Sequence, residues 1–198
     1  MSAGSLAKNF HFKATQMGQL TSHYPVLLIA AVTSRYESAI QWSITQAAKQ
    51  WGAVQLESDV FDFTETGFYA KTMGLDLRKQ LVAFQFTDPA ALADFKIASN
   101  LWEEQYAASH PHPETRPLNI DPGYITEAKL VLATTKDRDH RIYLRDGIYA
   151  EVTLHYQQHK WTQSRWTYPD YQRDDFQSFF TECRDLVRRR NKTAPAST

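Results

Sequence analysis

The chain has 198 residues, of which 42% are hydrophobic and 22% charged, a composition typical of a folded globular protein. Its lysines and arginines equal its aspartates and glutamates in number, and this zero net charge argues against a protein that binds nucleic acid through a basic surface. The single cysteine, Cys183, excludes a disulfide within the chain. Its longest apolar run falls well short of the ~20 residues needed to span a bilayer. We therefore expect a cytoplasmic protein with no membrane partner.

The distribution of periodic segments predicts one domain, over residues 24–190. Residues 1–23 show no hydrophobic periodicity, so we expect a flexible N-terminal arm there. Residues 191–198 are small and polar, which predicts a disordered tail.

The first half of the predicted domain begins with a buried strand and a helix. Val26–Val32 is a continuous apolar run, typical of a strand covered on both faces. Ser34 and Glu37 have the spacing of a capping box, which predicts a helix from Ser34 to Trp51. Further short strands are expected at residues 53–56, 69–73 and 81–86. Asp88, followed by a proline, then predicts the start of a second helix.

The second half is predicted to be mostly strand and turn, with a helix at its end. We expect a strand at Leu118–Asp121, a type II turn at Pro122–Gly123 and a short helix at Thr126–Ala133. A charged hairpin follows, and the apolar stripe of residues 170–190 predicts a final helix.

This order of elements predicts an α+β fold. We favour a two-layer sandwich with a ferredoxin-like βαββαβ core plus a C-terminal β-hairpin and helix. A doubly wound α/β sheet is the alternative.

The charged hairpin KDRDHRIYLRDGIYAEV (136–152) has one register that separates its polar and apolar residues. A three-residue loop, with Gly147 in the left-handed region, pairs Ile142 with Ala150 and Leu144 with Ile148. The aliphatic residues then share one face, while Arg141, Tyr143, Tyr149 and Glu151 share the other. That polar face either meets solvent or lines a cleft.

The candidate site residues come from this polar face and two neighbouring elements. We predict catalytic roles for four polar residues: Asp121, His140, Arg141 and Glu151. We predict ligand-binding roles for six others: Lys96, Asn100, Lys136, Tyr143, Asp146 and Tyr149. Each also has a structural explanation, such as a solvated helix face for Lys96 and Asn100.

The mixed charges suggest a pocket for a phosphorylated or carboxylated small molecule, with Mg²⁺ as a candidate cofactor on its carboxylates. The sequence has neither a phosphate loop nor a zinc-binding motif, so no residue is assigned to a metal. The alternative function is a non-catalytic interaction or scaffold protein that uses its aromatic residues to bind a partner or to form a homo-oligomer. Whether the protein is an enzyme is left open.

Several blocks resemble one family. They are FTETGFYAKTMG (63–74), KIASNLWE (96–103), NIDPGYI (119–125), HRIYLRDGIYAEVTL (140–154) and WTYPDY (166–171). Together they make the chain similar to the bacterial DUF4416 proteins, from the first strand to the last helix. Because that family has no assigned function, the resemblance implies no mechanism.

Overall fold

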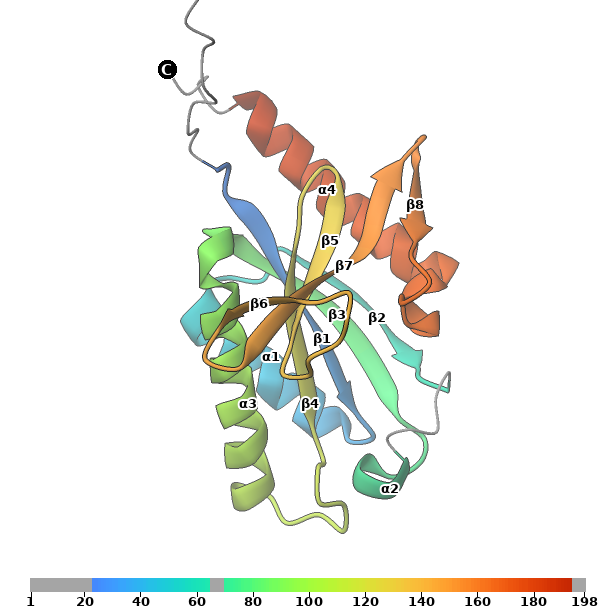
Figure 1. The fold of residues 1–198 in the computed structure, drawn as a ribbon. Helices are drawn as coiled ribbons and strands as arrows, with labels where there is room; N and C mark the ends of the chain where they lie inside the picture. Colours follow the sequence, from blue (N-terminus) through green and yellow to red (C-terminus); the bar gives the residue numbers. More distant parts are fainter. Residues whose placement is uncertain (1–22, 65–69, 194–198) are drawn as a thin grey trace, which may run out of the picture.

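The computed structural model describes residues 23–64 and 70–193. This part of the chain forms one eight-stranded sheet with four α-helices (Figure 1). The strands are β1 (Val26–Ser34), β2 (Leu56–Asp62), β3 (Arg78–Thr87), β4 (Asn119–Ile125), β5 (Lys129–Thr134), β6 (Ile142–Arg145), β7 (Ile148–Gln157) and β8 (Lys160–Gln163). The helices are α1 (Glu37–Trp51), α2 (Ala70–Met73), α3 (Leu92–Ser109) and α4 (Asp174–Thr193), with 3₁₀ turns η1 (Pro89–Ala91) and η2 (Pro169–Gln172).

The strand order is β2-β3-β1-β4-β5-β7-β6, and β8 also pairs with β7. Every neighbouring pair is antiparallel. The predicted α+β class is therefore confirmed. The doubly wound alternative is wrong, because that fold requires a mostly parallel sheet.

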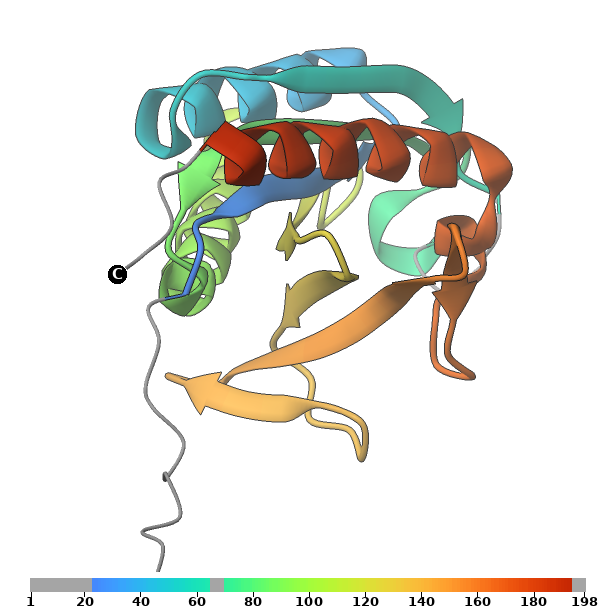
Figure 2. The same cartoon turned by 90° about the horizontal axis from the view of Figure 1, so that it is seen from above.

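Strand β1 is buried along its whole length because helices cover both faces of the sheet. Leu27 and Ile29 pack in a cluster with Phe176 and Phe180 of α4. Alternate residues such as Leu28 pack in a second cluster with α1 and α3. Figure 2 shows α1 and α4 on either side of the strands. The predicted two layers are thus corrected to three, since the apolar side chains of β1 point alternately to both faces.

The helix starts follow the sequence signals only in part. Asp88 caps η1, which leads into α3, because its side chain accepts a hydrogen bond from the amide of Ala90 at 2.8 Å. The capping box at Ser34 is wrong, since Ser34 ends β1 and its hydroxyl donates to the carbonyl of Pro117. Helix α1 begins at Glu37 instead.

Two predicted elements have the opposite secondary structure. Residues 70–73 form helix α2 instead of a strand, and position 69 lies outside the described residues. The helix predicted at Thr126–Ala133 is wrong, because Lys129–Thr134 is strand β5. A short apolar run is too short for its periodicity to distinguish a helix from a strand. Here the pairing of Lys129–Thr134 with β4 and β7 makes it a strand. At the C-terminus, α4 continues to Thr193, three residues past the predicted helix end.

The predicted turn at Pro122–Gly123 is also wrong, because β4 runs straight through both residues. Pro122 has the same parity as Ile120, whose N–H points away from β1 to a side chain of α3. The missing N–H of Pro122 therefore costs no bond to β1. A Cβ on Gly123 would lie 2.4 Å from the carbonyl oxygen of Val131, so glycine permits the close approach of β5.

Away from its loop the charged hairpin has the predicted register, but the loop itself is different. Ile142 pairs with Ala150 as predicted, whereas Arg145, rather than Leu144, pairs with Ile148. The loop is the two-residue Asp146-Gly147, with φ of 52° and 75°, values that suit a type I′ turn. A bulge between Tyr143 and Arg145 restores the register that places the aliphatic residues on one face.

Strands β4 and β5 pair over three residues only, Gly123–Ile125 with Leu130–Leu132. In Figure 1, β4 continues toward one end of the molecule and β5 toward the other. The first half of β4 consequently has β1 on one side and no strand on the other.

Candidate functional site

A cavity of about 120 Å³ lies where β4 and β5 diverge. A single water needs about 10–15 Å³ on the same measure, so a small organic molecule fits. Its charged lining consists of five cationic residues and three carboxylates: Lys79, Lys96, Arg116, Lys136, Arg141, Asp121, Glu151 and Asp170. Its other walls include aromatic rings and amides: Phe63, Tyr168, Tyr171, Asn100 and Asn119.

Side chains of α3 take the place of a strand along the open edge of β4. The amide of Ile120 donates to Glu103 Oε1 at 2.8 Å, and its carbonyl accepts a hydrogen bond from Lys96 Nζ, also at 2.8 Å. Both backbone groups are buried, and leaving them without hydrogen-bond partners would destabilise the folded protein. Lys96 and Glu103 of α3 thus bond the carbonyl and the amide of the same strand residue. They make a polar wall where a sheet would normally continue.

Asp121 presents an ionised carboxylate to this wall. Its Oδ1 accepts from Lys96 Nζ at 3.0 Å, and its Oδ2 accepts from the amide of Asn119 at 2.7 Å. Burial alone would raise the pKa of Asp121, but the charge of Lys96 and the hydrogen bond from Asn119 hold it below its ordinary value. The side chain remains 30% exposed and lines the cavity.

Arg116 links the loop before β4 to the same wall. Its guanidinium donates to Glu103 Oε2 through Nε at 3.1 Å and through Nη2 at 2.7 Å, and Nη2 also donates to Asn119 Oδ1. Burial raises the pKa of Glu103, although Lys96 and Arg116 favour its ionised form. The Arg116 side chain is 39% exposed and lines the cavity.

On the opposite wall, a buried ion pair attaches η2 to the sheet. Lys79 Nζ of β3 lies 2.5 Å from Asp170 Oδ2, and both side chains are almost completely buried. The same ammonium lies 4.0 Å from the ring centroid of Phe63. Thr167 provides a second attachment, since its hydroxyl donates to the carbonyl of Thr153 at 2.6 Å. Tyr168 is held between these two attachments.

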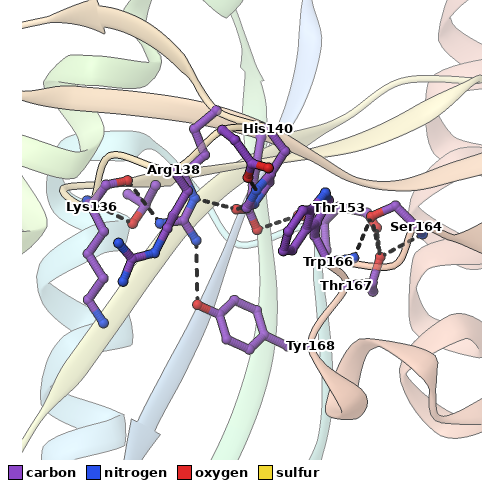
Figure 3. Close-up of polar contacts among 12 residues, drawn as sticks. Lys136, Arg138, His140, Thr153, Ser164, Trp166, Thr167 and Tyr168 are labelled. Carbon is purple, nitrogen blue, oxygen red and sulfur yellow. Dashed lines mark hydrogen bonds and ion pairs between the residues drawn. The ribbon is translucent and has the colours of Figure 1, made fainter.

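The polar face of the hairpin supplies the third wall. Arg141 Nε donates to Glu151 Oε2 at 2.7 Å, and these side chains are 4% and 6% exposed. The guanidinium also donates to the carbonyl of Lys136 at 2.9 Å and lies 3.5 Å from the hydroxyl of Tyr168 (Figure 3). Arg141 and Glu151, which were predicted to share the polar face of the hairpin, therefore form an ion pair.

His140 lies beside this pair and is absent from the cavity lining. Its Nε2 is 3.1 Å from Glu151 Oε2, and its ring stacks on Trp166 with centroids 4.8 Å apart. The imidazole thus contacts Trp166 through its ring and Glu151 through its Nε2. His140 therefore contacts the cavity through Glu151.

Lys136 also lines the cavity, where positive charges gather. Partial burial lowers the pKa of its ammonium, and the charges of Arg116 and Arg141 lower it further against the opposing effect of Asp121. An ammonium close to two guanidinium groups favours the binding of an anion among the three.

The cavity brings together six of the ten predicted site residues: Asp121, Arg141, Glu151, Lys96, Asn100 and Lys136. The other four are elsewhere. Tyr143 and Tyr149 contact each other on the hairpin surface, with ring centroids 5.3 Å apart. Asp146 pairs with Arg145 at the loop, and His140 lies behind Glu151.

Sequence reasoning missed several lining residues. Asn119, Tyr168 and Asp170 lie within the blocks NIDPGYI and WTYPDY, so attention to their polar positions could have found them. Lys79 and Arg116 carried no such signal. A lysine at the start of an apolar strand normally suggests an exposed strand end, and only the tertiary structure reveals its buried partner.

The structure gives no direct support for a metal or a membrane span. In residues 23–64 and 70–193, no group of three or more His, Cys, Asp or Glu side chains could hold a metal ion. Mg²⁺ on the cavity carboxylates stays a prediction, and Asp121, Glu151 and Asp170 each already contact a lysine or arginine. None of the described helices is both long and apolar enough to cross a membrane.

Comparison with known proteins gives a family and no function. Residues 24–186 match the family DUF4416, described as a domain of unknown function. The match includes every residue of the cavity lining. No curated protein matches the chain. No solved structure matches it either.

Proposed function

Because this chain belongs to the DUF4416 family, whose function is unknown, we propose from its cavity that it binds a phosphorylated or carboxylated small molecule. One observation carries the proposal: Arg116, Lys136 and Arg141 line one cavity that is large enough for a metabolite, and both guanidinium groups are close enough to Lys136 to lower the pKa of its ammonium. Guanidinium and ammonium groups are the side chains that proteins use for such anions.

Three groups are proposed to act directly on the anion. The guanidinium of Arg141 is fixed by Glu151, so its remaining N–H groups are oriented before a ligand arrives. Arg116 is fixed in the same way by Glu103. Lys136 adds a third positive charge. Glu151 positions Arg141, and His140 contacts Glu151 in turn. Asp121 pairs with Lys96 instead. The catalytic roles of Asp121, His140, Arg141 and Glu151 stay predictions.

The binding test compares one lysine and one arginine of the charged hairpin, of which only the lysine lines the cavity. Calorimetric titration with inorganic phosphate, propyl phosphate and citrate should give saturable binding of at least one of them. Lys136→Gln should weaken that binding about tenfold or more, as expected when a charged hydrogen bond is lost. Arg145→Gln is the control, since Arg145 is on the same hairpin but pairs with Asp94, outside the cavity.

Absence of binding by any of the three anions would refute the proposal. An equal loss of affinity in both variants would also refute it, because it would show a general effect of surface charge. A crystal soaked in phosphate should show density between Arg116, Lys136 and Arg141.

A second function is favoured by the edge strand β6. Ile142, Tyr143 and Leu144 are 70%, 57% and 39% exposed. An exposed apolar edge strand can pair with a strand of another chain. We propose a homo-oligomer contact there as the alternative to small-molecule binding. Sedimentation of the wild type and of Tyr143→Lys would test it, and a wild type that is monomeric at micromolar concentration would refute it.

Two finer assignments belong to the same proposal. The order β2-β3-β1-β4, with α1 and α3 packed against one face, supports a ferredoxin-like arrangement for the first half of the domain. A cytoplasmic location is supported by Cys183, which is a buried, unpaired thiol.

A further inference from the structure

The cavity lining has two chemically different parts, and they constrain its ligand beyond a negative charge. One part is cationic, with Arg116, Lys136 and Arg141. The other part, here called the inner wall, lies beside α3 and carries Asp121 and Asn100 together with Lys96. An anionic group of a ligand would be repelled by the carboxylate of Asp121, so it belongs beside the three cations.

The inner wall has hydrogen-bonding capacity that the protein does not use. Each oxygen of Asp121 accepts one hydrogen bond from a protein side chain, and a carboxylate oxygen has room for about two. The amide of Asn100 lines the cavity without a hydrogen-bond partner among residues 23–64 and 70–193. The wall therefore offers acceptors from Asp121 and both a donor and an acceptor from Asn100.

Charge decides which ligand group suits this wall. The ammonium of Lys96 lies 3.0 Å from Asp121, and Lys79 is close enough to lower the pKa of the same carboxylate. A second ammonium from a ligand would be repelled by both lysines. Another carboxylate or phosphate would be repelled by Asp121. A hydroxyl group meets neither repulsion, and it can donate to Asp121 while it accepts from Asn100.

From this arrangement we infer that the ligand is a hydroxylated anion, of the class of phosphorylated or carboxylated polyols and sugars. This inference rests on the proposed function and makes it more specific. The anionic end lies between Arg116, Lys136 and Arg141, and its hydroxyl groups face Asp121 and Asn100. The ring of Tyr168 lies near the guanidinium of Arg141, where it can contact the C–H face of the ligand.

The test uses pairs of ligands that match in charge and differ in hydroxyl groups. Ribose 5-phosphate and glycerol 3-phosphate are compared with propyl phosphate, and gluconate is compared with hexanoate, by calorimetric titration of the full chain. At least one hydroxylated ligand should bind about tenfold more tightly than its matched partner. This corresponds to one or two additional hydrogen bonds.

A variant assigns the preference to the inner wall. Asn100→Ala removes an amide without a partner in the described protein, so it should leave folding unchanged. It should weaken the hydroxylated ligand about threefold to tenfold and leave propyl phosphate or hexanoate unaffected. Gln105→Ala, an exposed position on the same helix, is the control and should change neither affinity.

The outcomes separate this inference from the proposed function. If the hydroxyl-free anions bind as tightly as their hydroxylated partners, the inference fails and anion binding stands. If Asn100→Ala weakens both kinds of ligand equally, the inner wall does not recognise hydroxyl groups and the inference fails. If no anion of either kind binds, both proposals fail.

Discussion

The sheet has two regions that are stabilised by different kinds of contact. Strands β3, β1 and β4 of the first region contribute side chains to the clusters on both faces of the sheet, and β1 is buried along its whole length. Strand β2, at the edge of this region, is half-exposed. In the second region, the middle of β5 is buried, β7 is partly buried and β6 is mostly exposed. Between them, where β4 and β5 part, lysines, arginines and carboxylates are buried in pairs.

This difference shows how a sheet can form a cavity without losing its hydrogen bonds. The backbone carbonyl and amide of Ile120, which another strand would otherwise bond, are bonded by Lys96 and Glu103 instead. Side-chain partners project into the space between the strands, whereas a strand would close it. The first region supplies rigid support, and the boundary supplies charge.

The largest expected effects on the free energy of unfolding are in the core of the first region and at the boundary between the two regions. Phe84→Ala in the first region should lower the free energy of unfolding by about 3–5 kcal/mol, because a fully buried ring leaves a cavity. Asp170→Ala at the boundary should lower it by a similar ~3–5 kcal/mol, because Lys79 is left buried without its partner. Urea denaturation measures both.

A double variant then separates the two cases. Lys79→Met combined with Asp170→Leu should recover much of the stability lost in Asp170→Ala, because it removes both charges from the interior. A double variant no more stable than Asp170→Ala would show that the boundary depends on specific hydrogen bonds and not on charge pairing.

A smaller effect is expected at the junction of the two regions. Gly123→Ala places a Cβ against the carbonyl of Val131 and should destabilise the protein by about 1–3 kcal/mol, since the backbone of β5 must move. Gly147→Ala also destabilises through its φ of 75°, but it meets no neighbouring atom. Only Gly123→Ala should therefore disturb the three β4–β5 residue pairs, which amide hydrogen exchange reports.

Two carboxylates at the boundary should give pH effects of opposite sign. The pKa of Asp121 is lowered in the folded state, so its ionised form stabilises the protein above the unfolded pKa of about 3.9, and this stabilisation is lost as pH falls through the folded value. The pKa of Glu103 is raised, so its ionisation opposes folding at neutral pH, and the opposition disappears as pH falls through its folded value.

Asp121→Asn and Glu103→Gln test these signs. The stability difference between wild type and Asp121→Asn should shrink toward low pH. Relative to Glu103→Gln, the wild type should become more stable as pH is lowered from neutral. Chemical denaturation from pH 7 down to pH 3 measures both differences, and parallel pH profiles for all three proteins would contradict the assignment.

The smallest effect is expected at the edge of the second region. Ile142→Ser should change the free energy of unfolding by no more than about 0.5 kcal/mol, because the side chain is 70% exposed. A loss above 1 kcal/mol in the monomer would show that this edge is covered by a contact outside the described residues.

The fold could be predicted from the sequence where a single element carries its own signal. The apolar run at Val26–Val32 predicted a strand buried on both faces, and the spacing of Phe176, Phe180 and Cys183 predicted the stripe of α4. The separation of polar and apolar faces in the hairpin also followed from its alternation, because side chains point to opposite faces of a strand. A bulge preserved that alternation even though the loop was different.

The site required contacts that sequence spacing does not contain. The sequence placed Asp121 in a strand, yet it also predicted a turn directly after it, where the structure continues β4 through Pro122 and Gly123. Lys96 was expected on a solvated helix face or facing a cleft, and its ammonium is in fact buried against β4. These outcomes depend on where β5 leaves β4, which is a long-range pairing.

The sequence by itself determined the α+β composition, the buried central strand and the polar face with Arg141 and Glu151. Only the tertiary structure decided that Arg141 and Glu151 line a cavity with Asp121, Lys96 and the buried Lys79–Asp170 pair, while Tyr143 of the same face stays exposed. Local patterns fix the face on which a side chain lies. What that face meets depends on strand pairing between residues far apart in the chain.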